Sequence, residues 1–228
     1  MPDDAVVVIP AAGQGVRMAA GQNKLLLPLG SLTIIQHSLN IFLKHPRISG
    51  IYLVIAERDE GALRSILPSE KEITLIYGGT ERQDSVFNAL KRIQQRTLLP
   101  RWILVHDGAR PLCPSALIGR ILAQCEMTGS AIPVMPLTDT IREITAEHCK
   151  VVDRSRLFAT QTPQGFEAKL LIDAYHAART KKWQTTDDAS IVEKFGHRVA
   201  SIEGDESNFK ITTHHDLRRA EWCLEQLK

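Results

Sequence analysis

The sequence has 228 residues, of which 43% are hydrophobic and 24% charged, and its formal net charge is +2. This composition is that of an ordinary globular protein, and the length predicts one α/β domain over residues 1–228. A net charge this small argues against nucleic-acid and membrane binding, so any anionic ligand would be held by local cations.

The cysteines and the N-terminus indicate a cytoplasmic protein. The four cysteines form no C-x-x-C pair, which argues against a zinc ribbon or thioredoxin chemistry and favours scattered reduced thiols. Asp3 and Asp4 stand where a signal peptide would be basic, and no apolar run approaches the roughly 18 residues that span a bilayer.

Short apolar runs alternate with helical patterns along the first 135 residues. The expected elements are a strand at Ala5–Ile9, a helix at Thr33–Lys44, strands at Ile51–Ile55 and Ile73–Ile76, a helix at Glu81–Gln95, a strand at Trp102–Val105, a helix at Ser115–Met127 and a strand at Ala131–Met135. This alternation predicts a mostly parallel sheet flanked by helices. Ligands of such sheets bind at the carboxyl ends of the strands, where Pro10–Gly15, Gly78–Asp84 and His106–Arg110 would lie.

Residues 137–158 interrupt this rhythm. Polar and apolar residues alternate with period two in Thr138–Ile144 and again in Lys150–Arg154, which predicts a two-stranded arm leaving the sheet. An isolated hairpin is marginal in water, so we expect the arm to pack on a second copy of the chain.

The C-terminal third predicts a helix at about Ala168–Lys181, a short helix from Asp187, a strand near Val199–Ile202 and a last helix from about His214. Thr213 and Asp216 have the spacing of a capping box. The intervening histidine pair is therefore interpreted as cap and surface rather than as a metal site.

The glycine-rich segment after the first strand indicates phosphate binding. It lacks the third glycine of a dinucleotide fingerprint, because Met18 stands there, and it has no Walker spacing. Its backbone amides could still approach a phosphate, and Arg17 and Lys24 could wrap a triphosphate. The alternative is that both cations are solvated surface residues.

Two further strand ends carry candidate residues. Asp107 could hold Mg²⁺ or a ribose hydroxyl, or could simply pair with Arg110 in a turn. Gly78 and Gly79 would let a flat base approach the backbone. Lys210 lies on a loop that could face the same edge of the sheet or be exposed.

Eight short motifs in order resemble the 2-C-methyl-D-erythritol 4-phosphate cytidylyltransferase family over nearly the whole chain. The motifs are P-A-A-G-x-G-x-R-M at Pro10–Met18 followed by Lys24, G-G-x-E-R-x-x-S-V at Gly78–Val86, V-H-D-G-A-R-P at Val105–Pro111, Asp139-Thr140, Asp153-Arg154, Thr162–Gln164, T-D-D-A at Thr186–Ala189 and Asn208–Lys210. The chain departs from the family pattern at Asn23, where a proline commonly precedes the lysine, and at Thr80, where some relatives carry an acid.

The resemblance implies a Rossmann-like nucleotidyltransferase sheet with a β-arm used for homodimerisation. It also implies transfer of CMP from CTP to 2-C-methyl-D-erythritol 4-phosphate in isoprenoid precursor synthesis, with Mg²⁺ held mainly by the CTP phosphates. The implied catalytic cations are Arg17, Lys24 and Lys210. The implied nucleotide-binding residues are Ala11, Ala12, Gly13, Gly15, Gly78, Gly79, Ser85, Asp107 and Gly108. The implied substrate-binding residues are Asp107, Arg110, Thr140, Arg154, Thr162 and Lys210, with Thr140 reaching a neighbouring subunit.

Three other functions share some of these features. A ribitol-5-phosphate cytidylyltransferase would share the fold, the nucleotide and the cations. A glycosyltransferase with a similar sheet would usually need an Asp-x-Asp metal motif, which this chain lacks. A nucleotide-sensing module without catalysis would not need Arg17, Lys24 and Lys210 together.

Overall fold

A mixed eight-stranded sheet forms the centre of the molecule in this computed structural model, which describes residues 4–13, 23–68 and 73–226. Its strand order is β10-β7-β11-β6-β1-β4-β5, and β12 pairs with the first part of β7. The strands are β1 (Ala5–Pro10), β4 (Ile48–Ile55), β5 (Ile73–Tyr77), β6 (Trp102–Val105), β7 (Ser130–Pro136), β10 (Phe158–Thr160), β11 (Gln164–Glu167) and β12 (Ala200–Glu203). The pairings of β1 with β4 and β6, of β4 with β5 and of β7 with β12 are parallel, as the alternating sequence predicted.

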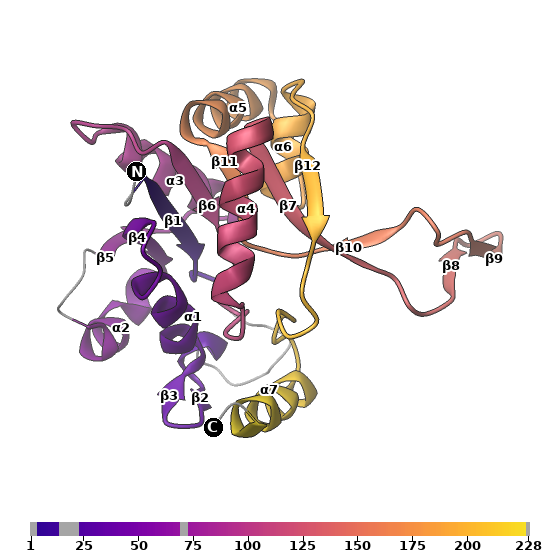
Figure 1. The fold of residues 1–228 in the computed structure, drawn as a ribbon, viewed down its shortest axis with the longest axis horizontal. Coiled ribbons are helices and arrows are strands. Elements are labelled where there is room, and N and C mark those ends of the chain that lie inside the picture. The colour runs from indigo at the N-terminus through magenta and orange to yellow at the C-terminus, as the bar shows by residue number, and fades with distance from the viewer. Residues whose placement is uncertain (1–3, 14–22, 69–72, 227–228) are drawn as a thin grey trace.

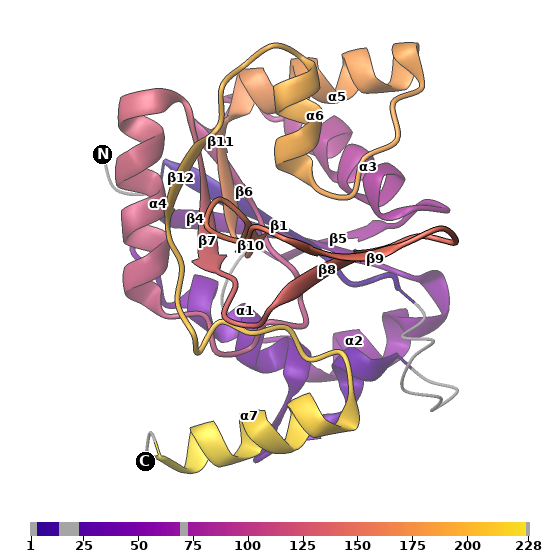
Figure 2. The ribbon, with the colours of Figure 1, turned by 90° about the vertical axis from the view of Figure 1, so that its right-hand side faces the viewer.

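Helices cover both faces of this sheet (Figures 1 and 2). The helices are α1 (Ile34–Leu43), α2 (Glu60–Ile66), α3 (Arg82–Gln94), α4 (Ser115–Thr128), α5 (Ala168–Lys181), α6 (Asp188–Lys194) and α7 (His214–Gln226). In β1, Val7 and Ile9 pack with α1 and α4, whereas Val6 and Val8 pack with α3, α5 and α6. The strand is therefore buried on both faces, which explains its uninterrupted apolar sequence.

The antiparallel part of the sheet was not predicted. Strand β11 lies between β6 and β7 and runs antiparallel to both, and β10 pairs antiparallel with the end of β7. Both strands are short, and Gln164 and Gly165 give β11 no apolar run. The short helix α2 and the two-residue strands β2 (Pro28–Leu29) and β3 (Leu32–Thr33) were also missed.

The predicted capping box at the start of α7 is confirmed. The Thr213 backbone N–H donates to Asp216 Oδ2 at 2.8 Å, and the Asp216 N–H donates to Thr213 Oγ1 at 3.2 Å. His214 and His215 are exposed in the first turn of the helix, as expected for cap and surface residues.

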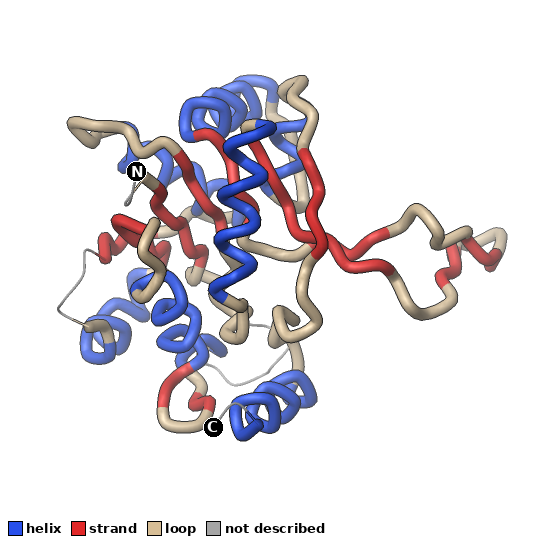
Figure 3. The backbone as a smooth tube through the Cα atoms, in the orientation of Figure 1, coloured by secondary structure: helices blue, strands red, loops and turns tan. Residues whose placement is uncertain are grey.

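The arm leaves the body of the molecule after β7 and returns through β10 (Figures 1 and 3). Strands β8 (Ile141–Ile144) and β9 (Cys149–Val152) form a separate antiparallel pair within it, which confirms the predicted hairpin. Its role in dimerisation stays a prediction. Among the residues that the structure describes, no helix is both long and apolar enough to cross a bilayer.

One histidine is completely buried in the turn that follows β6. His106 Nε2 lies 3.2 Å from the Arg110 carbonyl, which can only accept, so this nitrogen carries the proton. Its Nδ1 lies 3.2 Å from Thr162 Oγ1, and that oxygen already accepts the Asp107 backbone N–H at 2.9 Å. Burial, with a smaller contribution from the Arg110 charge, lowers the pKa of His106 to about 4. The ring is therefore neutral at physiological pH.

Strand β11 and helix α4 pack too closely for a side chain at Gly165. A Cβ there would lie 2.6 Å from Ile121 Cγ2 and 2.8 Å from Cys125 Sγ. We expect Gly165→Ala to lower the free energy of unfolding in urea by about 1–3 kcal/mol, because overpacking forces the neighbours to move. The control is Gly119→Ala, on α4 itself, where a Cβ meets nothing within 4 Å. This control should gain up to about 1 kcal/mol from helix propensity, and equal effects of the two changes would contradict the packing argument.

The neutral His106 predicts a pH dependence of stability. The unfolded histidine binds a proton near its ordinary pKa of 6.5, whereas the folded one binds it only near 4, so stability falls as the pH drops between these values. Over that window wild type should lose about 3 kcal/mol of unfolding free energy that His106→Gln does not lose. Urea unfolding of both proteins at about pH 7.5 and about pH 4.5 measures the difference. If the unfolding free energies of wild type and His106→Gln change equally with pH, the burial of neutral His106 does not cause the loss of stability.

Candidate functional site

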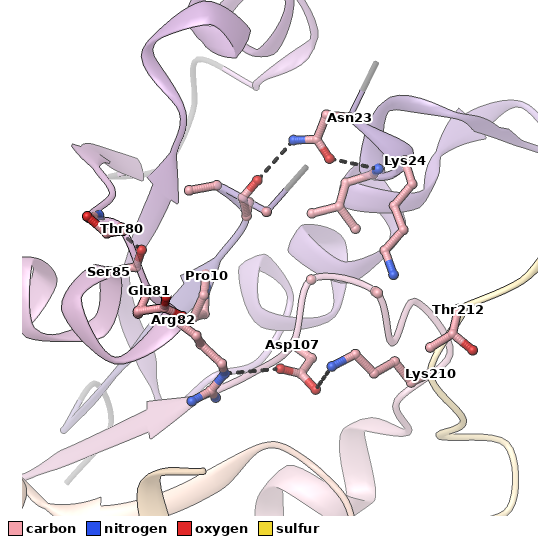
Figure 4. Close-up of a pocket in the computed structure, with 17 residues that line it drawn as sticks. Pro10, Asn23, Lys24, Thr80, Glu81, Arg82, Ser85, Asp107, Lys210 and Thr212 are labelled. Carbon is pink, nitrogen blue, oxygen red and sulfur yellow. Dashed lines mark hydrogen bonds and ion pairs between the residues drawn. The ribbon is translucent and has the colours of Figure 1, made fainter. Parts of the chain in front are cut away.

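A cavity of about 450 Å³ opens at the carboxyl ends of β1 and β6, beside the start of α3 (Figure 4). This is the edge of the sheet where the sequence predicted ligand binding. The lining residues come from five separate segments and are Pro10, Ala11, Ala12, Gly13, Asn23, Lys24, Leu25, Gly79, Thr80, Glu81, Arg82, Ser85, Asp107, Gly108, Ala109, Lys210 and Thr212.

One wall of the cavity is built from small residues that pack closely. A Cβ on Gly78 would lie 2.7 Å from Ala12 Cβ and 2.9 Å from Ser85 Oγ, and one on Gly79 would lie 2.4 Å from Asp84 Cβ. Ser85 Oγ accepts the Gly79 backbone N–H at 3.1 Å. Gly78 therefore lets the end of β5 approach the segment after β1, and Gly79 lets the chain pass close to the start of α3.

Asn23 fixes the segment that carries Lys24. It is 2% exposed, and its Nδ2 donates to the Ala11 carbonyl and to Asp59 Oδ2, both at 2.9 Å. Its Oδ1 accepts the Leu25 N–H at 3.1 Å and caps a short 3-10 helix, Lys24–Leu26. Asn23 thus ties the lysine segment to the end of β1 through hydrogen bonds.

The two predicted lysines that the structure describes meet at this cavity. Lys24 Nζ donates to the Ile211 carbonyl at 2.8 Å. Lys210, the residue before Ile211, places its Nζ 2.9 Å from Asp107 Oδ2. Residues nearly two hundred positions apart in the sequence are therefore neighbours in the fold (Figure 4).

Asp107 is shared by three cations. Besides Lys210, Arg110 Nε lies 3.6 Å from Asp107 Oδ2 and Arg82 Nε lies 3.7 Å from Asp107 Oδ1. Burial alone would raise the pKa of Asp107, but the nearby charges, led by Lys210 and Arg82, and the Lys210 hydrogen bond lower it well below its ordinary value. The carboxylate is therefore ionised at all physiological pH values. The Asp107–Arg110 turn pair that the sequence offered as an alternative is present, within this larger cluster.

Arg110 and Thr162 lie behind Asp107 rather than at the cavity wall. Arg110 Nη1 donates to the Asn208 carbonyl at 2.7 Å, and Asn208 Nδ2 donates to the Thr162 carbonyl at 2.8 Å. These bonds join the turn after β6 to the loop that carries Lys210. Both residues, predicted to bind substrate, are placed to position Asp107 and Lys210.

Arg82 is the main feature that the sequence interpretation missed. It was part of the quoted G-G-x-E-R motif but received no role. The structure places it in the cavity wall between Asp107 and Asp188, and its Nη2 lies 2.7 Å from Asp188 Oδ2. A spatial partner 106 positions away gives no signal in a single sequence.

The predicted residues thus fall into four groups. Those lining the cavity are Ala11, Ala12, Gly13, Lys24, Gly79, Ser85, Asp107, Gly108 and Lys210. Gly78, Arg110 and Thr162 contact this group from behind. Thr140 and Arg154 lie exposed on the arm, and Arg154 Nη1 donates to the Thr138 carbonyl there. Arg17 and Gly15 lie outside the described residues.

The cavity suits a polyanion better than a metal held by protein alone. In the part of the chain that the structure describes, no three His, Cys, Asp or Glu side chains are grouped as metal ligands. Lysine and arginine side chains from three segments surround one carboxylate instead, which favours a phosphate-bearing ligand.

Comparison with known proteins identifies the family. The sequence model described as 2-C-methyl-D-erythritol 4-phosphate cytidylyltransferase matches residues 5–226. Enzymes of that name from Bacillus thuringiensis and Bacillus velezensis are 41% and 42% identical over 222 and 221 residues, covering 96% and 95% of this chain and 96% and 94% of theirs.

Solved structures agree with this fold. The 4-diphosphocytidyl-2C-methyl-D-erythritol synthase of Anaerococcus prevotii superposes with a TM-score of 0.85 at 27% identity, covering 97% of this chain and 96% of that one. The 2-C-methyl-D-erythritol 4-phosphate cytidylyltransferase of Thermus thermophilus gives a TM-score of 0.79 at 32% identity, covering 96% and 98%. These matches confirm the resemblance seen in the motifs: the chain belongs to the 2-C-methyl-D-erythritol 4-phosphate cytidylyltransferase family.

Proposed function

We propose that the chain transfers CMP from CTP to 2-C-methyl-D-erythritol 4-phosphate and releases pyrophosphate, and that the reaction takes place in the cavity described above. The observation that carries this proposal is the convergence of Lys24, Lys210 and Arg82 around one cavity with a wall of small residues. The small residues suit a flat base and the cations suit a triphosphate.

The reaction needs charge stabilisation more than proton transfer. A phosphate oxygen of the acceptor attacks the α-phosphorus of CTP in line, the bond from that phosphorus to the β-phosphate oxygen breaks, and pyrophosphate leaves. The attacking group is already an anion, so no general base is required. Negative charge spreads over the oxygens on phosphorus, and fixed cations stabilise it without reorganisation.

Lys24 and Lys210 supply two of these cations, and Arg17 is proposed as a third. The Lys24 ammonium is held by the Ile211 carbonyl and the Lys210 ammonium by Asp107, so both cations are already in place when the charge develops. The ionised Asp107 also limits the repulsion among the cations before CTP binds.

Mg²⁺ is proposed as the cofactor, held mainly by the CTP phosphates and without a dedicated set of protein ligands. The residues present fit this arrangement, because the cavity offers few carboxylates and Mg²⁺ commonly binds through one or two of them together with phosphates. When bound, the ion would neutralise charge on the triphosphate.

The acceptor and the compartment are also part of the proposal. The relatives compared above are named for the methylerythritol phosphate enzyme, so ribitol 5-phosphate serves as the control acceptor. Pyrophosphate release from CTP should be fast with methylerythritol phosphate and at background with ribitol 5-phosphate. If CTP binds but no pyrophosphate is released with either acceptor, a nucleotide-sensing module would be favoured. The composition and the cysteine pattern support a cytoplasmic location.

We also propose a homodimer joined through the 137–158 arm. Ile144 pairs with Cys149 and Arg142 with Val151, so these four side chains share one face of the hairpin. Ile144 and Val151 are 74% and 57% exposed there. A second subunit would cover this apolar face, and Thr140 and Arg154 would then be available to a neighbouring subunit's site.

We expect Lys24→Ala to lower kcat by about a hundredfold or more with a retained fold, because one lost electrostatic contact to a transition state costs on the order of 3 kcal/mol. Arg17→Ala should behave in the same way. Lys44→Ala, an exposed lysine at the end of α1, is the control and should keep wild-type turnover. Turnover of Lys24→Ala close to that of Lys44→Ala would remove Lys24 from this role.

We expect wild type to sediment as a dimer at micromolar concentration and the double change Ile144→Glu with Val151→Glu to sediment as a monomer. Charges on that face would be buried without partners in a dimer. Lys150→Gln, on the opposite face of the hairpin, should remain dimeric. A monomeric wild type, or a dimeric double variant, would place the subunit contact elsewhere.

A further inference from the structure

Asp188 is a completely buried carboxylate that lines no part of the cavity. It is the first residue of α6, and both of its oxygens are engaged: Tyr175 donates its hydroxyl to Oδ1, and Arg82 Nη2 donates to Oδ2 at 2.7 Å. A buried charge is costly unless it is paired, so the sequence retains this carboxylate together with two specific partners. Neither partner comes from α6, which means that the carboxylate joins α6 to α3 and α5.

Arg82 lies between two carboxylates and is closer to one of them than to the other. Its Nη2 contacts Asp188 at 2.7 Å, whereas its Nε is 3.7 Å from Asp107 Oδ1. The guanidinium therefore forms a hydrogen-bonded ion pair with the buried Asp188, whereas its contact with Asp107 is longer than a hydrogen bond. The side chain is 31% exposed and belongs to the cavity wall (Figure 4), so its position affects the site directly.

Removing the Asp188 charge would let Arg82 compete with Lys210 for Asp107. An arginine that has lost one carboxylate partner can rotate its planar guanidinium onto the remaining carboxylate and bind it through two parallel hydrogen bonds. Asp107 Oδ2 is now the acceptor of Lys210 at 2.9 Å. A bidentate Arg82 would displace that ammonium from the place where it faces the cavity.

We propose that Asp188 is a positioning residue of the active site, which holds Arg82 away from Asp107 so that Asp107 can fix Lys210. This inference rests on the proposed function, because it assigns the Lys210 position to the transfer reaction. Asp188 acts through Arg82 and touches neither the cavity nor its ligand. Asp188 would otherwise be only a structural residue that joins helices.

A double-mutant cycle tests whether Asp188 acts through Arg82. Asp188→Asn should lower kcat at least tenfold in the wild-type background, with the KM for CTP changing less than threefold. In the Arg82→Met background the same change should alter kcat less than threefold, because the residue through which Asp188 acts is already gone. An equal loss in both backgrounds would show that Asp188 does not act through Arg82 and would overturn the proposal, as would full activity of Asp188→Asn.

Asp187→Asn is the matched control. It changes the same charge one residue away, and asparagine can still cap α6 by accepting the Ser190 N–H that Asp187 now accepts at 3.0 Å. Its kcat should stay within threefold of wild type. An equal loss of kcat in Asp187→Asn and Asp188→Asn would show a general effect of α6 and contradict the specific role. If Asp188→Asn does not fold, the double variant with Arg82→Met, which removes both charges of the pair, is compared with Arg82→Met alone.

A crystal structure of Asp188→Asn, or of the double variant, tests the geometry without any assay. In Asp188→Asn, Arg82 should contact Asp107 through two nitrogens, and Lys210 Nζ should leave hydrogen-bonding distance of Asp107. In the double variant Lys210 should stay on Asp107. An unchanged Arg82 in Asp188→Asn would overturn the positioning role even if activity fell. A wild type that transfers no CMP would instead refute the proposed function and leave this geometric result independent.

Discussion

The ionised carboxylate of Asp107 is the interaction on which the site depends. Burial would neutralise it, and it remains charged only because Lys210, Arg82 and Arg110 stand close to it. The relation is reciprocal, since three cations gathered at one sheet edge would repel one another without a fixed negative charge. These cations come from α3, from the turn after β6 and from the segment before α7. The cluster therefore exists only when both layers of helices have packed on the sheet.

The sheet brings these segments together through its mixed topology. The parallel strands β1, β4 and β6 place their carboxyl ends at one edge, and the antiparallel β11 begins at the same edge, so Thr162 just before it lies there. Thr162 then holds the turn after β6 through the Asp107 N–H. The cations at the cavity are held by hydrogen bonds of this kind, so their positions are fixed by the protein itself.

Two residues show why the candidate site could be predicted only in part. Asn23 follows a segment with no periodic pattern, and its hydrogen bonds reach the Ala11 carbonyl and Asp59, 36 positions away. Arg82 stands at the start of α3, and its buried partner Asp188 lies 106 positions away. The local sequence pattern shows which residues are apolar and at what spacing they recur. It contains no information about partners that are distant in the sequence.

The sequence by itself determined the α/β class, the limits of most helices and strands, the arm and the cap of α7, because these follow from periodicity and from hydrogen bonds between near neighbours. Its motifs also indicated the family. Only the tertiary structure decided the antiparallel strands, the placing of Lys24 beside the Lys210 segment and the sharing of Arg82 between two carboxylates. Those features depend on which distant segments meet when the two faces of the sheet are covered, and that is settled by packing rather than by any local pattern.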